Sequence, residues 1–369
     1  MSRDTTPAVG AAGGPARWRR AREGAAVAGH RGRFRDGSWS FLFGADTGYA
    51  AAEPREPAPI PEHDGHVQGP VMKPPVWTWE VPAYFWTGGI ASGSAFVALA
   101  CDLAGDHRSA RIARLVSLGA LAPSPPLLIL DLGRPMRFLN MLRVFKPRSP
   151  MSTGAWALSA FGGLITGAVG ADLLGRRREA QALGAATAVV GGYLGSYTGV
   201  LLASTAVPVW ARSRLFLGPI FVATATATGA AACRLVLVAT GLPPGHSTRE
   251  ALGRVETGAM AAELILSQVN DARLGELAGT LEHGRPGRFF AAAKWLVRGG
   301  LSLRMVRGPA GPWTHHVASA AYLAAGLCFR YAWVGAGRAS ARDDAMVART
   351  ARGRATAPES GDVVRVTVH

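Results

Sequence analysis

The sequence has few of the residues that hold metal ions. It contains only three cysteines, Cys101, Cys233 and Cys328, and no Cys-x-x-Cys pair. Iron–sulfur clusters and structural zinc sites are held by clustered cysteine or histidine ligands. The scattered thiols therefore exclude a cluster or a structural zinc site built by this chain alone, and their spacing gives no support for a disulfide.

Charged residues are missing from three long stretches, 81–101, 151–171 and 180–211. A membrane-spanning helix needs about 20 mostly apolar residues, because each residue rises about 1.5 Å through a hydrocarbon core about 30 Å thick. Three stretches of this length are hard to explain as core helices of a soluble protein. The sequence therefore predicts an all-α polytopic membrane protein.

The order of apolar stretches predicts an eight-helix transmembrane bundle with disordered polar tails. The spans are expected at about 80–103, 112–131, 151–173, 182–208, 215–239, 254–271, 289–306 and 315–336. Prolines at 123, 125 and 126 predict a break in the second span. The expected parts are a disordered tail rich in Arg, Gly, Ala and Pro (1–70), the membrane domain (71–337) and a polar C-terminal tail (338–369).

Histidine is absent from the middle of every predicted span. The nine histidines fall in tails, loops or helix ends: His30, His63, His66, His107, His246, His283, His315, His316 and His369. Haem held between membrane helices needs axial ligands at mid-membrane depth. The sequence therefore argues against a haem-binding cytochrome b.

Lysine is scarce as well, although the formal net charge is +16. Only three of the 40 basic residues are lysines, and the basic residues are spread over tails and loops. A nucleic-acid-binding protein gathers its positive charge on one face. Phospholipid head groups beside membrane helices explain the charge more simply, so we expect membrane lipid and no nucleic acid as a partner.

The ionisable residues inside predicted spans include Arg234, Glu263, Arg298 and Arg330. An unpaired charge at a helix centre costs at least ~2.5–3.5 kcal/mol, so each residue should have a partner or face a wet cavity. We expect Glu263 to pair with Arg234 or Arg330, either as a structural ion pair or as part of a proton path. Ser204, near the end of the fourth span, could extend such a path, although hydroxyls in membrane helices often bond their own backbone.

The beginning of the first span combines aromatic residues with a carboxylate. Trp77, Trp79, Tyr84 and Trp86 form an aromatic belt, which by itself indicates only anchoring at the membrane surface. Glu80 is not explained by anchoring, and it lies four residues before Tyr84, one helical turn away. A partly buried carboxylate beside a phenol can exchange protons with a ligand.

Three motifs in this chain resemble the NrfD/polysulfide reductase membrane-subunit family. They read VWTWEVPAYFWTGGIASGS from Val76, DLGRPMRFLNMLRVFKPRSPMSTGAW from Asp131 and YTGVLLASTAVPVW from Tyr197. The resemblance extends over roughly 70–336. It implies an eight-helix subunit without haem or an iron–sulfur cluster of its own, which exchanges electrons between menaquinone or ubiquinone and a partner.

The resemblance also implies partners and a location. The expected partners are a four-cluster ferredoxin-like iron–sulfur subunit and a molybdopterin catalytic subunit, as in polysulfide reductase, nitrite-linked and formate dehydrogenase-like complexes. The expected location is the bacterial plasma membrane, which the chain would cross many times. Two other readings stay open: a secondary transporter, and a passive anchor without quinone chemistry.

The site residues follow from the resemblance and from the motifs. The quinone site is expected to include Trp79, Glu80, Tyr84, Asp131, Arg134 and Tyr197. A proton path is expected to use Ser204, Arg234, Glu263 and Arg330. The basic connection after the second span, with Arg137, Arg143, Lys146 and Arg148, is expected either to dock the iron–sulfur partner or to anchor lipid head groups.

The side of the membrane on which the two termini lie is predicted less directly. An even number of spans puts both termini on one side, and the loops there are the more basic, which favours the cytoplasm. The Gly-Arg-Arg-Arg run at 175–178 lies on the opposite side and opposes this assignment. In several members of the family the partner faces the outside, so the orientation stays open.

Overall fold

The computed structural model describes residues 70–132, 135–305 and 313–351, without the side chains of 135–138 and 351. All of them belong to one compact unit. Every regular element in these ranges is a helix, so the prediction of an all-α membrane protein is confirmed in its fold class. The predicted tails 1–69 and 352–369 lie outside the described residues.

Long helices make up most of the fold. They are α3 (Glu80–Leu103), α4 (His107–Leu121), α7 (Pro150–Leu173), α8 (Arg177–Ala203), α10 (Arg214–Ala239), α11 (Ser247–Leu274), α13 (Gly284–Met305) and α14 (Trp313–Ser340). The short ones are α5 (Ser124–Leu132), α6 (Pro135–Arg143), α9 (Pro208–Arg212), the 3-10 helix η1 (Gly275–Ala278), α12 (Gly279–Glu282) and α15 (Asp344–Ala351). Helices α14 and α15 reach into the predicted C-terminal tail, whose boundary stays a prediction.

The proline-rich second span is broken, as its sequence predicts. Helix α4 ends at Leu121 and α5 begins at Ser124, with Pro123 between them. Proline lacks the backbone N–H that would continue the hydrogen-bond ladder, and its ring crowds the preceding turn. The break separates α5 from α4 and lets α5 take its own position against α3.

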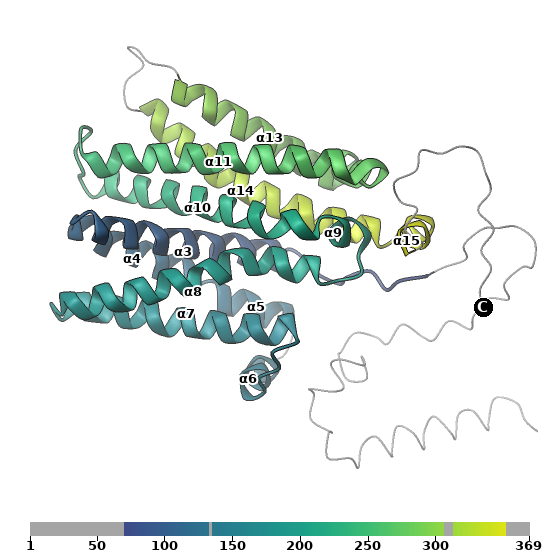
Figure 1. Ribbon diagram of the computed structural model, residues 1–369, viewed down its shortest axis with the longest axis horizontal. Helices are drawn as coiled ribbons and strands as arrows, with labels where there is room; N and C mark the ends of the chain where they lie inside the picture. The colour runs from purple at the N-terminus through teal and green to yellow at the C-terminus, as the bar shows by residue number, and fades with distance from the viewer. Residues whose placement is uncertain (1–69, 133–134, 306–312, 352–369) are drawn as a thin grey trace, which may run out of the picture. The chain divides into compact units, whose positions relative to one another are not determined.

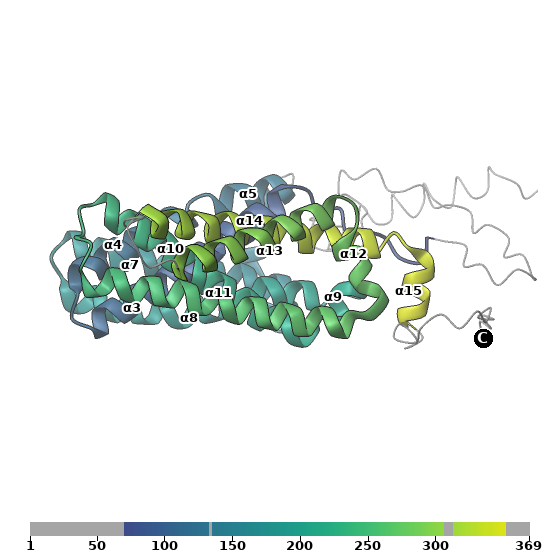
Figure 2. The same cartoon turned by 90° about the horizontal axis from the view of Figure 1, so that it is seen from above.

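The long helices lie side by side with their axes roughly along one direction (Figures 1 and 2). We call the two ends of this bundle the Glu80 end and the Leu103 end, after the first and last residues of α3. The first and last described segments meet at the Glu80 end, where the backbone N–H of Val71 donates to Asp344 Oδ1 over 2.9 Å. The prediction that both termini share a side stays a prediction, since 1–69 and 352–369 lie outside the described residues.

Small residues let α3 and α10 approach until their backbones touch. A Cβ atom at Gly93 or at Gly229 would collide with the backbone of the facing helix. Close approach of this kind replaces the hydrophobic driving force that lipid does not provide between helices. At the Glu80 end the core is aromatic instead, and Trp210 Nε1 donates to the carbonyl oxygen of Trp333 over 2.9 Å.

Six helices in the described residues are long and apolar enough to cross a membrane. They are Glu80–Leu103, His107–Leu132 with its break, Pro150–Leu173, Arg177–Ala203, Arg214–Ala239 and Trp313–Ser340. Helices α11 and α13 have the necessary length, but they carry too many charged residues for the same criterion. The predicted count of eight spans is therefore not confirmed, whereas several membrane-crossing helices are.

Candidate functional site

A cavity at the Glu80 end brings together three residues that the sequence analysis assigned to one site. It occupies about 780 Å³, part of it open to the surface, between the first turns of α3 and α7, the whole of α5 and the last turns of α8. Tyr84, Asp131 and Tyr197 contribute its polar groups together with Ser124 and Thr198. Most of the remaining wall is apolar: Trp77, Leu128, Leu132, Met141, Met151, Ala155, Leu158, Leu194 and Leu201.

The broken second span supplies one wall of this cavity. Ser124, Leu128 and Asp131 recur at helical spacing along α5, so they share one face, and all three line the cavity. The Ser124 hydroxyl lies 2.9 Å from the hydroxyl of Thr87, which ties this face to α3. The proline break thus has a consequence for the site, because it sets the direction in which Asp131 points.

The position of Tyr197 depends on a glycine in the facing helix. The ring lies directly over Gly154 of α7, and a Cβ atom there would collide with the ring. On its other side Tyr197 meets Tyr193, with ring centroids 5.8 Å apart. The hydroxyl of Tyr193 in turn donates to Thr153 Oγ1 over 2.9 Å. Two adjacent residues of α7 therefore fix both tyrosines of α8.

Trp77 lines the cavity although the sequence analysis treated it only as part of an aromatic belt. Its ring stacks on that of Trp210 at 5.2 Å and 22°, which connects the segment before α3 to α9. The sequence gives no direct signal for this contact, since the two residues lie 133 positions apart, the difference between 77 and 210. Gly154 was missed for the same reason.

Trp79 and Glu80 lie apart from the three cavity residues. Trp79 is 57% exposed and lines a different groove, between α3, α13 and α14. Glu80 begins α3 outside the cavity lining, and its carboxylate accepts a hydrogen bond from the Thr78 hydroxyl. The structure thus places these two predicted site residues beside the cavity and not in its wall.

The basic connection between α5 and α7 lies at the same end of the bundle. Arg143, Lys146 and Arg148 are exposed. Ser152 holds this connection in place, because its hydroxyl donates to the carbonyl oxygen of Val144 and accepts from the backbone N–H of Lys146, each over 3.0 Å. Arg134 and the side chain of Arg137 lie outside the described residues.

The four residues of the predicted proton path do not gather at one place. Glu263 is buried in α11, where Oε1 accepts from the Ser267 hydroxyl over 2.7 Å. The guanidinium of Arg330 lies 3.7 Å over the ring of Phe221. Ser204, at the end of α8, donates to the backbone of Leu201 over 2.8 Å.

Glu263 forms no direct ion pair among the described residues, but Arg330, one of its two predicted partners, interacts with it electrostatically at longer range. The other expected partner, Arg234, lies instead beside Glu256, with 3.9 Å between Nε and Oε1. Glu256 is fully buried and also contacts Arg304 of α13. Glu256 precedes Glu263 by two helical turns, so it meets Arg234 at the Leu103 end, where Glu263 does not reach. Arg298, also expected in a span, is exposed beside Trp295.

Acidic residues follow one face of α11 from its third turn to its last. Glu256 and Glu263 are seven residues apart on the buried stripe, and Asp271 follows at the Glu80 end with its carboxylate 2.9 Å from Lys294 Nζ. A cavity of about 330 Å³ lies between Glu263 and Lys294. The seven-residue spacing was visible in the sequence and would have indicated this shared face.

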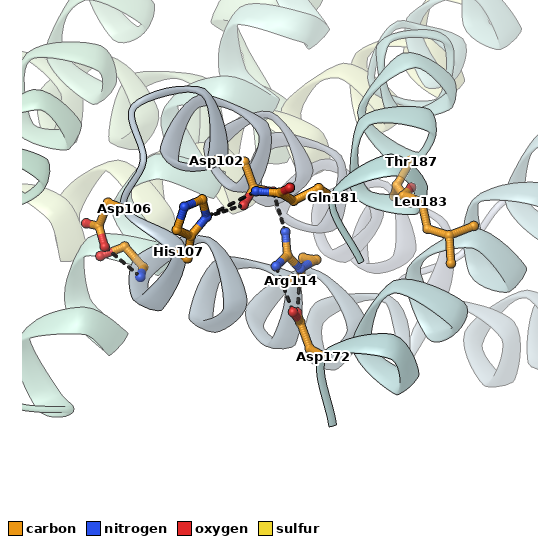
Figure 3. Close-up of polar contacts among 9 residues, drawn as sticks. Asp102, Asp106, His107, Arg114, Asp172, Gln181, Leu183 and Thr187 are labelled. Atoms are coloured by element: carbon orange, nitrogen blue, oxygen red, sulfur yellow. Dashed lines mark hydrogen bonds and ion pairs between the residues drawn. The ribbon is translucent and has the colours of Figure 1, made fainter. Parts of the chain in front are cut away.

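A second buried ion cluster lies at the Leu103 end of α3, α4 and α7 (Figure 3). Arg114 donates through Nε and Nη2 to both oxygens of Asp172 over 2.6 and 2.9 Å, and through Nη1 to Asp102 Oδ2 over 2.5 Å. His107 contacts Asp102 over 3.4 Å and Gln181 over 3.1 Å. This cluster joins four helices and was not predicted.

Asp106, in the turn before α4, forms a smaller link at the same end. It accepts hydrogen bonds from the backbone N–H of Ser109 over 3.1 Å and from the hydroxyl of Thr248 over 2.5 Å. Burial raises the pKa of Asp106, but these hydrogen bonds outweigh it, so the pKa lies below its ordinary value. The contact with Thr248 ties the α3–α4 turn to the start of α11.

No metal-binding group of three or more His, Cys, Asp or Glu side chains occurs in the part of the chain that the structure describes. Cys101, Cys233 and Cys328 are free thiols.

The sequence model of the family described as "Polysulphide reductase, NrfD" matches residues 70–267, which is more than half of the chain and includes every helix that lines the cavity. No curated protein matches the chain.

Proposed function

The chain belongs to the NrfD polysulphide reductase family and is a multi-pass membrane protein, and from this premise we propose that it is the quinone-reactive membrane subunit of a polysulfide reductase-like oxidoreductase. In this role it exchanges electrons between menaquinone or ubiquinone and an iron–sulfur partner. The observation that carries the proposal is the cavity with Tyr84, Asp131 and Tyr197.

The chemistry of the cavity matches what a quinone ring requires. A quinone is a flat apolar ring with two opposed oxygens, and it reaches its site from the lipid. Two phenol hydroxyls in a largely apolar wall can bond such oxygens, and the apolar part of the wall can hold the ring. Asp131 adds the one carboxylate of the lining, which is the group needed to accept or supply a proton.

Oxidation of a quinol releases two electrons and two protons and leaves the quinone. In the proposed reaction, Tyr84 and Tyr197 hold the two ring oxygens. Asp131 accepts the first proton, passes it on, and then accepts the second. Glu80, at the start of α3, passes protons on toward water. The electrons leave to the nearest cluster of the partner subunit, and quinone reduction runs the same steps in reverse.

The exposed basic residues from the end of α6 onward support docking of that partner at the same end. Arg143, Lys146 and Arg148 form a positive surface close to the cavity, and positive potential speeds encounter with an acidic protein. The expected partners are a four-cluster ferredoxin-like subunit and, beyond it, a molybdopterin catalytic subunit. Charge reversal of Arg143 and Lys146 should release the iron–sulfur subunit from purified bacterial membranes, and unchanged co-purification would contradict docking.

The acidic face of α11 supports a second part of the proposal, proton movement across the membrane. Glu256, Glu263 and Asp271 lie at successive levels between the two ends of the bundle, each beside a cation or a hydroxyl. If α11 and α13 also cross the membrane, this face provides a line of proton-exchanging groups in its interior. A cysteine at exposed Ile265 of α11 should then resist water-soluble maleimide in intact vesicles, unlike one in the α11–α13 connection.

The direct test of the central proposal is binding of a quinol analogue, such as a hydroxyquinoline N-oxide, to the purified full-length chain. Binding should weaken by several-fold to tenfold in Tyr84→Phe or Tyr197→Phe, because each loses a hydrogen bond worth about 0.5–1.5 kcal/mol. Tyr193→Phe is the matched control, since Tyr193 belongs to the same helix but does not line the cavity.

Glu80→Gln tests the proton route separately. The variant should bind the analogue as the parent chain does and should lose quinol-dependent turnover of the assembled complex. Turnover equal to that of the parent would remove Glu80 from the route. Failure of the parent chain to bind any quinone analogue would favour the transporter or the passive anchor.

A further inference from the structure

A second groove at the Glu80 end lies on the outer surface of α3, α13 and α14. It encloses about 1370 Å³, much of it open, and it does not share lining residues with the cavity of Tyr84. We infer that this groove is a binding site for an anionic phospholipid, whose phosphate is held by Arg285, Arg288 and Arg338 and whose acyl chains lie along α3 and α13.

The positive charge of the groove is not balanced by its own lining. Three guanidiniums line it, two from the first turns of α13 and one from the last turn of α14, and no acidic residue does. Within the described ranges none of the three arginines forms an ion pair. An arginine fork bonds two oxygens of a phosphate at once, so three forks from two helices suit a phosphodiester head group.

The rest of the groove suits the acyl part of a lipid. Pro82, Ala292 and Val334 form apolar parts of the wall, and Phe289 stacks on Tyr331 with ring centroids 5.3 Å apart at 27°. Aromatic and basic residues at the end of membrane helices mark the level of the lipid head groups. A ligand that combines a phosphate with long apolar chains therefore matches both parts of the groove, whereas a free phosphate matches only one.

The groove is held in shape by a contact between its two sides. The hydroxyl of Tyr331 in α14 donates to the carbonyl oxygen of Trp79, just before α3, over 3.2 Å. Trp79 itself is 57% exposed and lines the groove. An exposed indole at this position is expected to contact the lipid, which gives a direct optical probe of occupancy.

The experiment uses the purified full-length chain and offers it dioleoylphosphatidylglycerol and dioleoylphosphatidylcholine at equal concentration. Native mass spectrometry should find phosphatidylglycerol retained in preference to phosphatidylcholine. In the triple variant Arg285→Gln/Arg288→Gln/Arg338→Gln the affinity for phosphatidylglycerol should fall on the order of a hundredfold, since each arginine near an anionic surface gives about a fivefold gain.

The matched control removes the same charge elsewhere on the surface. Arg254→Gln/Arg273→Gln/Arg298→Gln changes three exposed arginines of α11 and α13 outside the groove, and it should retain the preference for phosphatidylglycerol. Equal loss in both triple variants would mean that net charge, and not the groove, attracts the lipid, and would overturn the site.

A second measurement needs no arginine variant and so does not depend on their folding. Phosphatidylglycerol with brominated acyl chains should quench the Trp79 fluorescence, taken as the difference between the parent chain and Trp79→Phe, more strongly than brominated phosphatidylcholine. Equal quenching by the two lipids would contradict the proposal.

Two other occupants are separate outcomes of the same series. Displacement of phosphatidylglycerol by inorganic phosphate at the same concentration would identify a free-anion site, and the lipid proposal would be wrong. The groove triple variant could instead retain phosphatidylglycerol and lose the co-purifying iron–sulfur subunit. This result would identify a protein interface and would overturn the lipid proposal.

Discussion

The two halves of the bundle distribute their charged groups in different ways. In the half formed by α3, α4, α5, α7 and α8, the charged groups of the interior lie toward the ends: Asp131 in the cavity of Tyr84 at one end and the Arg114 cluster at the other. In the half formed by α10, α11, α13 and α14 they follow the length of the helices, from Glu256 through Glu263 to Asp271.

This difference explains why α11 does not meet a simple criterion for a membrane span. Charged groups at helix ends leave a long apolar middle, and the helices of the first half meet the criterion, as do α10 and α14 of the second half. Charged residues on one buried face lower the mean hydropathy of a helix although they do not face lipid. Glu256 and Glu263 are residues of this kind in α11. A criterion based on composition therefore depends on where the charges lie along the helix axis. It does not record whether those charges face lipid.

The largest expected effect is a loss of stability when the Arg114 cluster, at the Leu103 end of the first half, is broken. Arg114→Met leaves the carboxylates of Asp102 and Asp172 buried without their cation, and loss of one partner from a buried ion pair costs about 3–5 kcal/mol. We expect a large fall in thermal stability in detergent. The control Arg176→Met removes an exposed ion pair with Glu179, which is worth at most about 1 kcal/mol. A similar fall in thermal stability in this control would contradict a special role for the buried cluster.

The next largest expected effect is a loss of quinone affinity at the cavity of Tyr84. Gly154→Ala places a methyl group against the ring of Tyr197, and forced displacement of a packed side chain costs about 1–3 kcal/mol. We expect binding of a quinone analogue to weaken by about tenfold or more, measured by titration of the purified chain. Gly163→Ala is the control, because a Cβ atom there meets open space. Unchanged affinity in Gly154→Ala would separate Tyr197 from the site.

A change in the second half should leave quinone binding intact. Glu263→Gln keeps the size of the side chain and its contact with Ser267 but removes the exchangeable proton. In vesicles with the assembled complex we expect quinol-dependent electron transfer to continue while coupled proton movement falls, recorded with a pH-sensitive dye. Parallel loss of both activities would contradict the assignment of quinone chemistry to the first half and proton movement to the second.

The smallest effect is expected at the turn that links the halves. Because the pKa of Asp106 is lowered in the folded state, its contribution to stability is present above the unfolded pKa of about 3.9 and is lost as pH falls through the folded value. Thr248→Ala should cost about 0.5–1.5 kcal/mol near neutral pH, with the difference shrinking below about pH 4. A difference that is constant with pH would exclude this hydrogen bond as its source.

Much of the fold was predictable because it follows from local patterns. The charge-free stretches predicted α3, α7 and α8, and the prolines predicted the separation of α4 from α5. The charge pairings were not predictable in this way. Asp102 and Asp172 each follow directly after a charge-free stretch and fall at the ends of predicted spans, but the sequence does not reveal that Arg114 of a neighbouring helix reaches both.

The candidate site was predictable only in part. Family motifs indicated Tyr84, Asp131 and Tyr197, which do line one cavity, although their role stays a prediction. Trp77 and Gly154 were missed because each acts through a residue distant in sequence. Trp79 was expected beside Tyr84, but the two point to different sides of α3, as residues five positions apart on a helix do.

Photoaffinity labelling with an azidoquinone tests the central claim most directly. The full-length chain is irradiated with the probe in lipid, digested, and the labelled peptides are identified. The account predicts label in the segments that line the cavity, around Trp77 to Tyr84, Ser124 to Leu132 and Leu194 to Leu201, and competition by excess unlabelled quinone. Label confined to other helices, or label that excess quinone does not reduce, would contradict it.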